Sequence, residues 1–184
     1  MRRKRVRVSG MAASNEAATV ASSPHTERPM YQRILAGFDG SHEARLAVDQ
    51  AAALAQAFGG RVRIVWAIGS PTMPESREIY SVDTLRNTEH QSADHALAEL
   101  QRTLEGAGVV VETGVLMLDS TDDDIGNALE HEAVRWQADT IVVGSQNRSG
   151  LSRILLGSVA ERTVKLSRRT VIVVRAQHAD HTGG

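Results

Sequence analysis

The residues with the clearest capacity for chemistry form a glycine- and serine-containing loop, residues 144–150, and a helix start that follows it at Gly157, Ser158 and Val159. Glycine lets the backbone approach a ligand closely and turn its N–H groups toward it. The first residues of a helix add unpaired N–H donors and the positive end of the helix dipole, which suit a phosphate. The segment matches neither G-x-x-x-x-G-K-[ST] nor G-x-G-x-x-G. From the residues alone, a phosphate site and an ordinary connecting loop are equally good interpretations.

A second polar segment, residues 119–124, crowds four aspartates before Ile125. Such a cluster could suggest a metal loop, but the spacing of a calcium-binding loop is absent. Carboxylates at the N-terminus of a helix offset its dipole, and Thr121 and Asp124 are spaced like a capping box. We therefore interpret the segment as the start of a helix.

Catalytic groups are harder to assemble. Asp39, Ser41 and His42 are suitable residue types, but adjacency in sequence does not give the geometry of a catalytic triad. The chain has no cysteine, which excludes a thiol nucleophile and cysteine-based metal sites. Two histidine pairs also lack the spacing of a helical zinc site: His90 with His95, and His178 with His181. We interpret the protein as a binding protein and not as a dedicated enzyme.

The elements that must position these residues alternate between strand and helix. Apolar, largely β-branched runs predict strands at 33–38, 62–67, 109–116, 140–143 and 170–174. Apolar residues at helical spacing predict helices whose buried faces run along 44–58, 93–104, 125–136 and 158–166. This order predicts an α/β fold, a doubly wound five-stranded parallel sheet with helices on both faces (Rossmann-like). Ligands of such sheets bind in the loops after the strands, here 39–41, 67–74, 118–124 and 144–157.

Composition and charge narrow the classes of protein. Of the 184 residues, 41% are hydrophobic and 23% charged, which is typical of a globular domain. Aromatic residues make up 3%, too few for stacking single-stranded nucleic acid, and no apolar run reaches the ~18 residues of a membrane span. Residues 1–29 are basic and show no hydrophobic period, so we expect a disordered leader or a non-native start. The folded domain is expected at 30–175 and a frayed tail at 176–184.

The body resembles the universal stress protein family from Met30 to about Arg175. The resemblance rests on RILAGFDGS at 33–41, on ADTIVVGS at 138–145 and on the loop that follows. Nucleotide-binding members of that family carry G-x2-G-x9-G-[ST]. Gly144 fills the first position and Gly157 with Ser158 the last, at the correct spacing, while Asn147 replaces the middle glycine. Asparagine is among the residues that best tolerate a left-handed backbone.

The resemblance implies a site for ATP, or for AMP or ADP, with Mg²⁺. Asp39 would lie near the adenosine end, although it could instead simply cap the first helix. Ala67 would lie against the adenine, and Val143 and Gly144 would line the approach to ribose and phosphates. The residues that would surround the phosphates are Gln146, Asn147, Gly157, Ser158 and Val159.

The function implied by the resemblance is that of a cytoplasmic ATP-binding regulator of the stress response, in which the nucleotide alters shape or the choice of an unknown protein partner. Slow ATP hydrolysis is compatible with this. The family also implies a homodimer that pairs through Val171, Ile172, Val173 and Val174. An apolar edge strand is otherwise an aggregation hazard. We expect neither a membrane nor a nucleic acid as partner.

Two alternatives stay open. Asn147 favours a nucleotide-free dimeric interaction module of the same fold, whereas Gly157 and Ser158 argue against it. A nucleotide-activating enzyme is more remote, because such enzymes carry Ser-Gly-Gly-x-Asp-Ser after the first strand. This chain has Gly-Phe-Asp-Gly-Ser at 37–41.

Overall fold

The computed structural model describes residues 30–69, 82–118, 124–145 and 156–176, the side chains of 82–86 excepted. Strands and helices alternate along these residues, which confirms the predicted α/β fold. The strands are β1 (Arg33–Gly37), β2 (Arg61–Ile68), β3 (Val110–Met117), β4 (Thr140–Gly144) and β5 (Thr170–Val174). The helices are α1 (His42–Phe58), α2 (Val82–Gly106), α3 (Ile125–Arg135) and α4 (Ser158–Leu166).

The strands form one parallel sheet in the order β3-β2-β1-β4-β5, as the doubly wound prediction requires. The chain builds outward from β1 to β3 and then returns to the other side of β1 for β4 and β5. The order reverses between β1 and β4, where Ile34 pairs with Thr140 and Ala36 with Val142. Ligands of open α/β sheets bind at such a reversal, beyond the carboxyl ends of the strands. The turns that follow β1 and β4 meet there.

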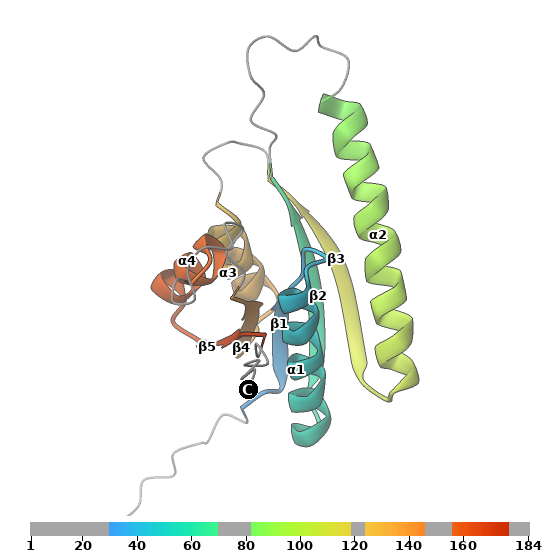
Figure 1. The fold of residues 1–184 in the computed structure, drawn as a ribbon. Coiled ribbons are helices and arrows are strands. Elements are labelled where there is room, and N and C mark those ends of the chain that lie inside the picture. The colour runs from blue at the N-terminus through green and yellow to red at the C-terminus, as the bar shows by residue number, and fades with distance from the viewer. Residues whose placement is uncertain (1–29, 70–81, 119–123, 146–155, 177–184) are drawn as a thin grey trace, which may run out of the picture.

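Helices cover both faces of the sheet (Figure 1). Helices α1 and α2 pack on one face, where Ile64 and Leu100 are buried, and α3 and α4 pack on the other, around Leu129 and Ile141. Burial on both faces explains why β1 and β4 are almost continuously apolar. Within the described ranges, none of the helices combines the length and the apolarity that a membrane crossing requires.

Helix α1 follows the predicted apolar stripe with one exception. Ala47, Val48 and Ala51 are buried against the sheet, and Gly59 ends the helix in the left-handed conformation. Phe58, which the spacing placed on the same stripe, is 51% exposed. It is the last residue of the helix, and its ring packs against Tyr31, with ring centroids 4.9 Å apart. The prediction that Phe58 belongs to the buried face was therefore wrong.

The C-terminal end of α3 is tied to the sheet by charged side chains. The buried Glu132 accepts hydrogen bonds from Arg63 of β2 and, at 2.7 and 2.6 Å, from Arg135. Glu112 of β3 pairs with Arg63 at 3.3 Å and accepts a hydrogen bond from Trp136 Nε1 at 3.1 Å. Burial alone would raise the pKa of Glu132, but the hydrogen bonds and charges of the two arginines outweigh it and hold the pKa below the ordinary 4.5. This network fixes α3 on β2 and β3.

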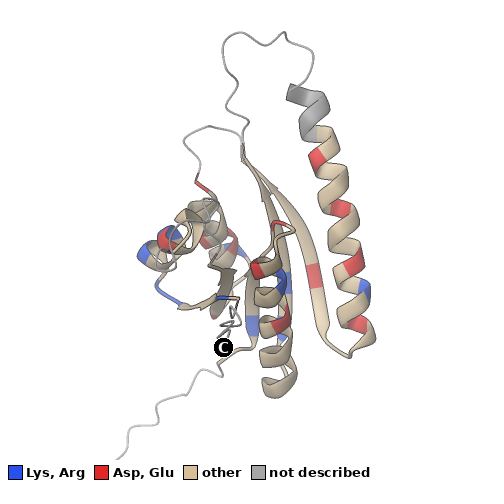
Figure 2. Ribbon diagram, viewed as in Figure 1, with Lys and Arg blue, Asp and Glu red and all other residues tan. Residues whose placement is uncertain are grey.

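Charge is unevenly distributed over the helices (Figure 2). Acidic residues recur along α2, whereas α4 carries both signs. The acidic residues of α2 whose side chains are described are Glu89, Asp94, Glu99 and Glu105, against the single described arginine Arg102. The side of the sheet covered by α2 is therefore the more negative.

Candidate functional site

A cavity of about 410 Å³ opens at the carboxyl edge of the sheet, at the reversal between β1 and β4. This volume lies in the range of small-molecule sites, which is roughly 300–1,000 Å³. The predicted site residues that line it are Asp39, Ala67, Val143, Gly144, Gly157, Ser158 and Val159. The lining residues that the sequence analysis did not assign to the site are Gly37, Phe38, Ser41, Ala44, Val65, Trp66, Glu89, Ile125 and Leu129.

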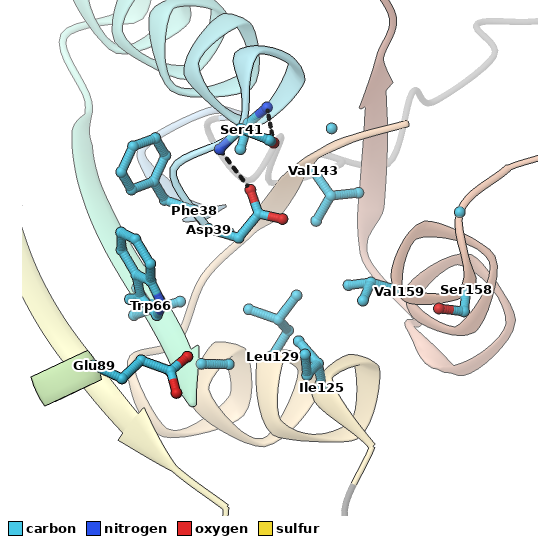
Figure 3. Close-up of a pocket in the computed structure, with 16 residues that line it drawn as sticks. Phe38, Asp39, Ser41, Trp66, Glu89, Ile125, Leu129, Val143, Ser158 and Val159 are labelled. Carbon is cyan, nitrogen blue, oxygen red and sulfur yellow. Dashed lines mark hydrogen bonds between the residues drawn. The ribbon is translucent and has the colours of Figure 1, made fainter. Parts of the chain in front are cut away.

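The turn after β1 presents a carboxylate to this cavity. Ser41 caps α1, because its Oγ accepts a hydrogen bond from the Ala44 N–H at 3.1 Å. Asp39 Oδ1 accepts a hydrogen bond from the Ser41 N–H at 3.0 Å. Its second oxygen points away from that bond (Figure 3). The helix cap is thus Ser41, and within the described residues one oxygen of Asp39 is left for another donor.

Position 144, at the end of β4, requires glycine because of packing. A Cβ atom there would lie 2.8 Å from the backbone carbon of Glu43 and 2.9 Å from the backbone nitrogen of Ala44. Real Cβ atoms do not approach backbone so closely, so any side chain would push α1 away from β4. This position needs glycine whether or not a ligand binds.

The start of α4 is different, because its first-turn donors receive no side-chain cap within the described residues. Gly157 is the N-cap in an extended conformation, and no side chain of the described residues bonds to this helix start. The Gly157 carbonyl accepts the first intrahelical bond from the Glu161 N–H at 2.9 Å. The N–H groups of the first turn and the positive end of the helix dipole are available to an anion. Gly157, Ser158 and Val159 all line the cavity.

The starts of α3 and α4 are interlocked beside the cavity. Asp124 caps α3 by accepting a hydrogen bond from the Gly126 N–H at 2.6 Å, and its other oxygen pairs with Arg162 of α4 at 2.9 Å. A Cβ atom on Gly126 would lie 2.7 Å from Arg162 Cγ. Asp124 is therefore the N-cap itself and not the last residue of a capping box that begins at Thr121, which corrects that part of the prediction. Thr121 lies outside the described residues.

The opposite side of the cavity is built by β2 and α2. Trp66 lies at the end of β2, and its ring meets Phe38 edge-on with centroids 5.5 Å apart. Glu89 reaches the cavity from α2. Figure 3 shows Trp66 and Glu89 on one side, Ser158 and Val159 on the other, and Asp39 between them.

Negative and positive charge also lie on different sides of the cavity. Asp39 and Glu89 are its only charged side chains among the described lining residues. Among those described residues, the positive pole is the start of α4, since none of them is a lysine or arginine. The described residues also contain no group of three or more His, Asp or Glu side chains that could hold a metal ion. The site can therefore accept an anion at α4 and hydrogen-bond donors at Asp39 and Glu89.

Most of the predicted site residues come together around this cavity, and two could not be placed. Gln146 and Asn147 lie outside the described residues. Sequence analysis missed Ile125 and Leu129, although both belong to the predicted apolar face of α3, whose start had to lie near the ligand edge of the sheet. Glu89 gave no signal, because one acidic residue on a polar helix surface resembles its neighbours.

A doubly wound parallel sheet with helices on both faces and a cavity at its reversal defines a Rossmann-like α/β domain. The model of the universal stress protein family matches residues 30–175, and the chain belongs to that family. A universal stress protein of Methanocaldococcus jannaschii is 30% identical over 147 residues, which span 79% of this chain and 83% of the relative.

Solved structures agree with this assignment. The structure of hypothetical protein MJ0577 is 26% identical, with a TM-score of 0.66 over 82% of this chain and 99% of its own. A universal stress protein solved in complex with cAMP is 26% identical, with a TM-score of 0.59 over 79% of this chain and 98% of its own.

Proposed function

We propose that this protein binds an adenine nucleotide, ATP with Mg²⁺ in the first instance, and acts as a nucleotide-dependent binding switch in the stress response. The observation that carries the proposal is the convergence of seven predicted site residues on one cavity that faces an open helix start. The similar universal stress protein that was solved with cAMP supports an adenine nucleotide as the ligand class.

The charges of the cavity favour one orientation of the nucleotide. The phosphates would lie at the start of α4, where Ser158 and Val159 offer backbone N–H groups and Ser158 its hydroxyl. The free oxygen of Asp39 would accept a hydrogen bond from a ribose hydroxyl in the middle of the cavity. The base would lie beyond it, toward Ala67 at the end of β2.

In this proposal Mg²⁺ is held mainly by the phosphates of the nucleotide. The described residues lack a metal cluster of their own, and proteins commonly bind Mg²⁺ through one or two ligands plus substrate phosphates. Its contribution would be to neutralise phosphate charge in a cavity whose charged lining side chains, as far as described, are both acidic. Chelation of Mg²⁺ should therefore weaken ATP binding more than AMP binding.

The decisive experiment is calorimetric titration of the protein and its Gly157→Val variant with Mg-ATP. Gly157 has φ −61° and ψ 153°, which valine adopts readily, so the variant acts through the bulk it places over the α4 donors. Since hydrogen bonds to charged groups contribute about 1.5–3 kcal/mol each, the loss of even one of them should lower the affinity at least roughly tenfold. Gly106→Val is the matched control, because a Cβ on Gly106 meets nothing within 4 Å. Equal ATP affinity of parent and Gly157→Val would show that the phosphates lie elsewhere.

The proposed switch is a cytoplasmic homodimer that pairs through β5, an edge of the sheet. The Val174 carbonyl accepts a hydrogen bond from the Ser145 N–H at 2.8 Å, so the backbone groups of Val174 and Ile172 face β4. Because backbone direction alternates along a strand, the N–H and C=O groups of Val173 point to the other side, the free edge of the sheet. Val173→Pro should leave the fold intact and shift the protein to monomer in sedimentation, whereas Ile172→Pro should disrupt the fold itself. A Val173→Pro dimer as strong as the parent would exclude pairing through β5.

One observation favours a second candidate, a nucleotide-free interaction module. Because Gly144 is required by the close approach of α1, it would be retained in a protein that binds no nucleotide. Of the glycine pattern, only Gly157 and Ser158 at the start of α4 then indicate a ligand. This candidate predicts a folded dimer in which neither ATP nor AMP changes the heat signal or the stability.

A further inference from the structure

Helix α2 contributes one side chain to the cavity that the glycine pattern of the sequence does not include. Glu89 lines the cavity beside the end of β2, on the side opposite the start of α4 (Figure 3). Its carboxylate makes no hydrogen bond or ion pair within the part of the chain that the structure describes. Asp39, by contrast, already uses one oxygen for the Ser41 N–H. Among the described lining residues, Glu89 is therefore the carboxylate with both oxygens available to a ligand.

Trp66 forms the aromatic wall of the cavity on the same side as Glu89 (Figure 3). The Trp66 ring is half-buried and meets Phe38 edge-on, with an angle of 85° between the ring planes. Gly40 lies against the same ring, since a Cβ there would be 3.2 Å from it. A carboxylate next to a fixed aromatic surface can accept a hydrogen bond in the plane of a flat ligand while the apolar wall bounds that ligand.

The negative charge near Glu89 determines which part of a ligand can bind at this end of the cavity. Glu89 and Asp39 repel phosphates, and the acidic residues that recur along α2 act in the same direction. An ionised carboxylate is only an acceptor of hydrogen bonds. A base that presents an exocyclic amino group therefore fits this end, whereas one that presents a carbonyl oxygen at the same place meets a like-charged acceptor.

We propose that Glu89 selects the base of the bound nucleotide by accepting a hydrogen bond from the exocyclic amino group of adenine. The proposal rests on nucleotide binding as put forward above and deepens it. Glu89 is then a specificity-determining residue supplied by α2, independent of the glycine loop. It makes the cavity discriminate adenine from hypoxanthine, which has the same shape but carries an oxygen in place of the amino group.

The experiment compares Mg-ATP with Mg-ITP by calorimetric titration in the parent and in Glu89→Gln. Because Glu89 is open to water, its hydrogen bond contributes modestly, and the parent should bind ATP roughly five- to tenfold more tightly than ITP. Glutamine both accepts and donates, so Glu89→Gln should bring the ATP-to-ITP ratio close to one. Glu99→Gln, the same exchange at an exposed position further along α2, should keep the parent's ratio.

Each outcome of this experiment bears on one of the two proposals. A parent that prefers ATP and a Glu89→Gln variant that does not would support selection by Glu89. A parent that binds ATP and ITP equally, or a Glu89→Gln variant that keeps the preference, overturns selection by Glu89 and leaves nucleotide binding standing. A parent that binds neither nucleotide overturns the proposed function and Glu89's role with it.

Discussion

The two ends of helix α3 lie in opposite surroundings. At its C-terminal end, Glu132 is 4% exposed and its charge is met by Arg63 and Arg135, so the polar groups satisfy one another. At its N-terminal end, Ile125 and Leu129 border a cavity in which Asp39 and the first turn of α4 keep hydrogen-bonding capacity to spare. The paired charges at the C-terminal end fix the helix on the sheet. The polar groups at the N-terminal end can still form hydrogen bonds with a ligand. Changes at the first end should therefore alter stability, and changes at the second should alter binding.

The largest effect is expected from Glu132→Ala. Removing one partner of a buried ion pair leaves the other charge uncompensated, and Arg63 is only 14% exposed. Such changes cost about 3–5 kcal/mol, and Glu112 offsets part of that here, so we expect about 3 kcal/mol less stability in urea unfolding. Glu161→Gln, which breaks the exposed Glu161–Lys165 pair, should leave the unfolding midpoint unchanged.

The same Glu132→Ala variant tests whether the two ends are separate. Under conditions where it stays folded, its affinity for Mg-ATP should lie within about twofold of the parent's, which is ordinary for a site with which it shares no partner. A loss of ATP affinity in proportion to the loss of stability would mean that the Glu132 network also shapes the cavity. The two ends of α3 would then not be separate.

A smaller and mixed effect is expected from Gly126→Ala at the cavity end. The added methyl group would stand 2.7–2.8 Å from Arg162 Cγ and Cβ, atoms close to the α4 backbone, so α4 must shift. Overpacking of this kind typically costs about 1–3 kcal/mol. Because α4 carries the proposed phosphate donors, ATP affinity should fall severalfold as well. Gly106→Ala, which adds a methyl group in open space, should do neither.

The smallest effect concerns pH. Since the folded-state pKa of Glu132 lies below 4.5, its stabilising contribution is complete above about pH 4.5 and is lost as the pH falls through the lower, folded-state value. Urea midpoints measured from pH 6 down to pH 3 should decline, and the decline should be shallower in Glu132→Gln. Identical pH profiles for the two proteins would show that other carboxylates govern acid sensitivity.

Much of the fold could be predicted because local signals were strong. The bounds of α4 and β5 follow from Gly157 before a helical stripe and from the β-branched run after Arg169. Most of the site followed from topology, because parallel strands bring their carboxyl ends to one edge. The loops after the strands could thus be assigned to one place, and the resemblance to the universal stress protein family picked out Asp39, Ala67 and Gly144 at that edge.

What could not be predicted depends on pairings across long sequence separations. Arg63 alternates with apolar residues in β2 like any solvent-facing residue, and nothing near it in sequence marks Glu132, 69 positions away, as its partner. Glu89 enters the cavity only because α2 packs beside β2. The glycine requirement at Gly144 was assigned to a ligand, whereas the approach of α1 accounts for it.

Native mass spectrometry of the freshly purified protein, first without and then with added Mg-ATP, tests the central proposal most directly. We predict a dimer that carries the mass of an adenine nucleotide on isolation or gains it on addition, and Gly157→Val should lose that increment while remaining a dimer. A dimer of bare mass that stays bare after addition of Mg-ATP would contradict nucleotide binding and favour the interaction module.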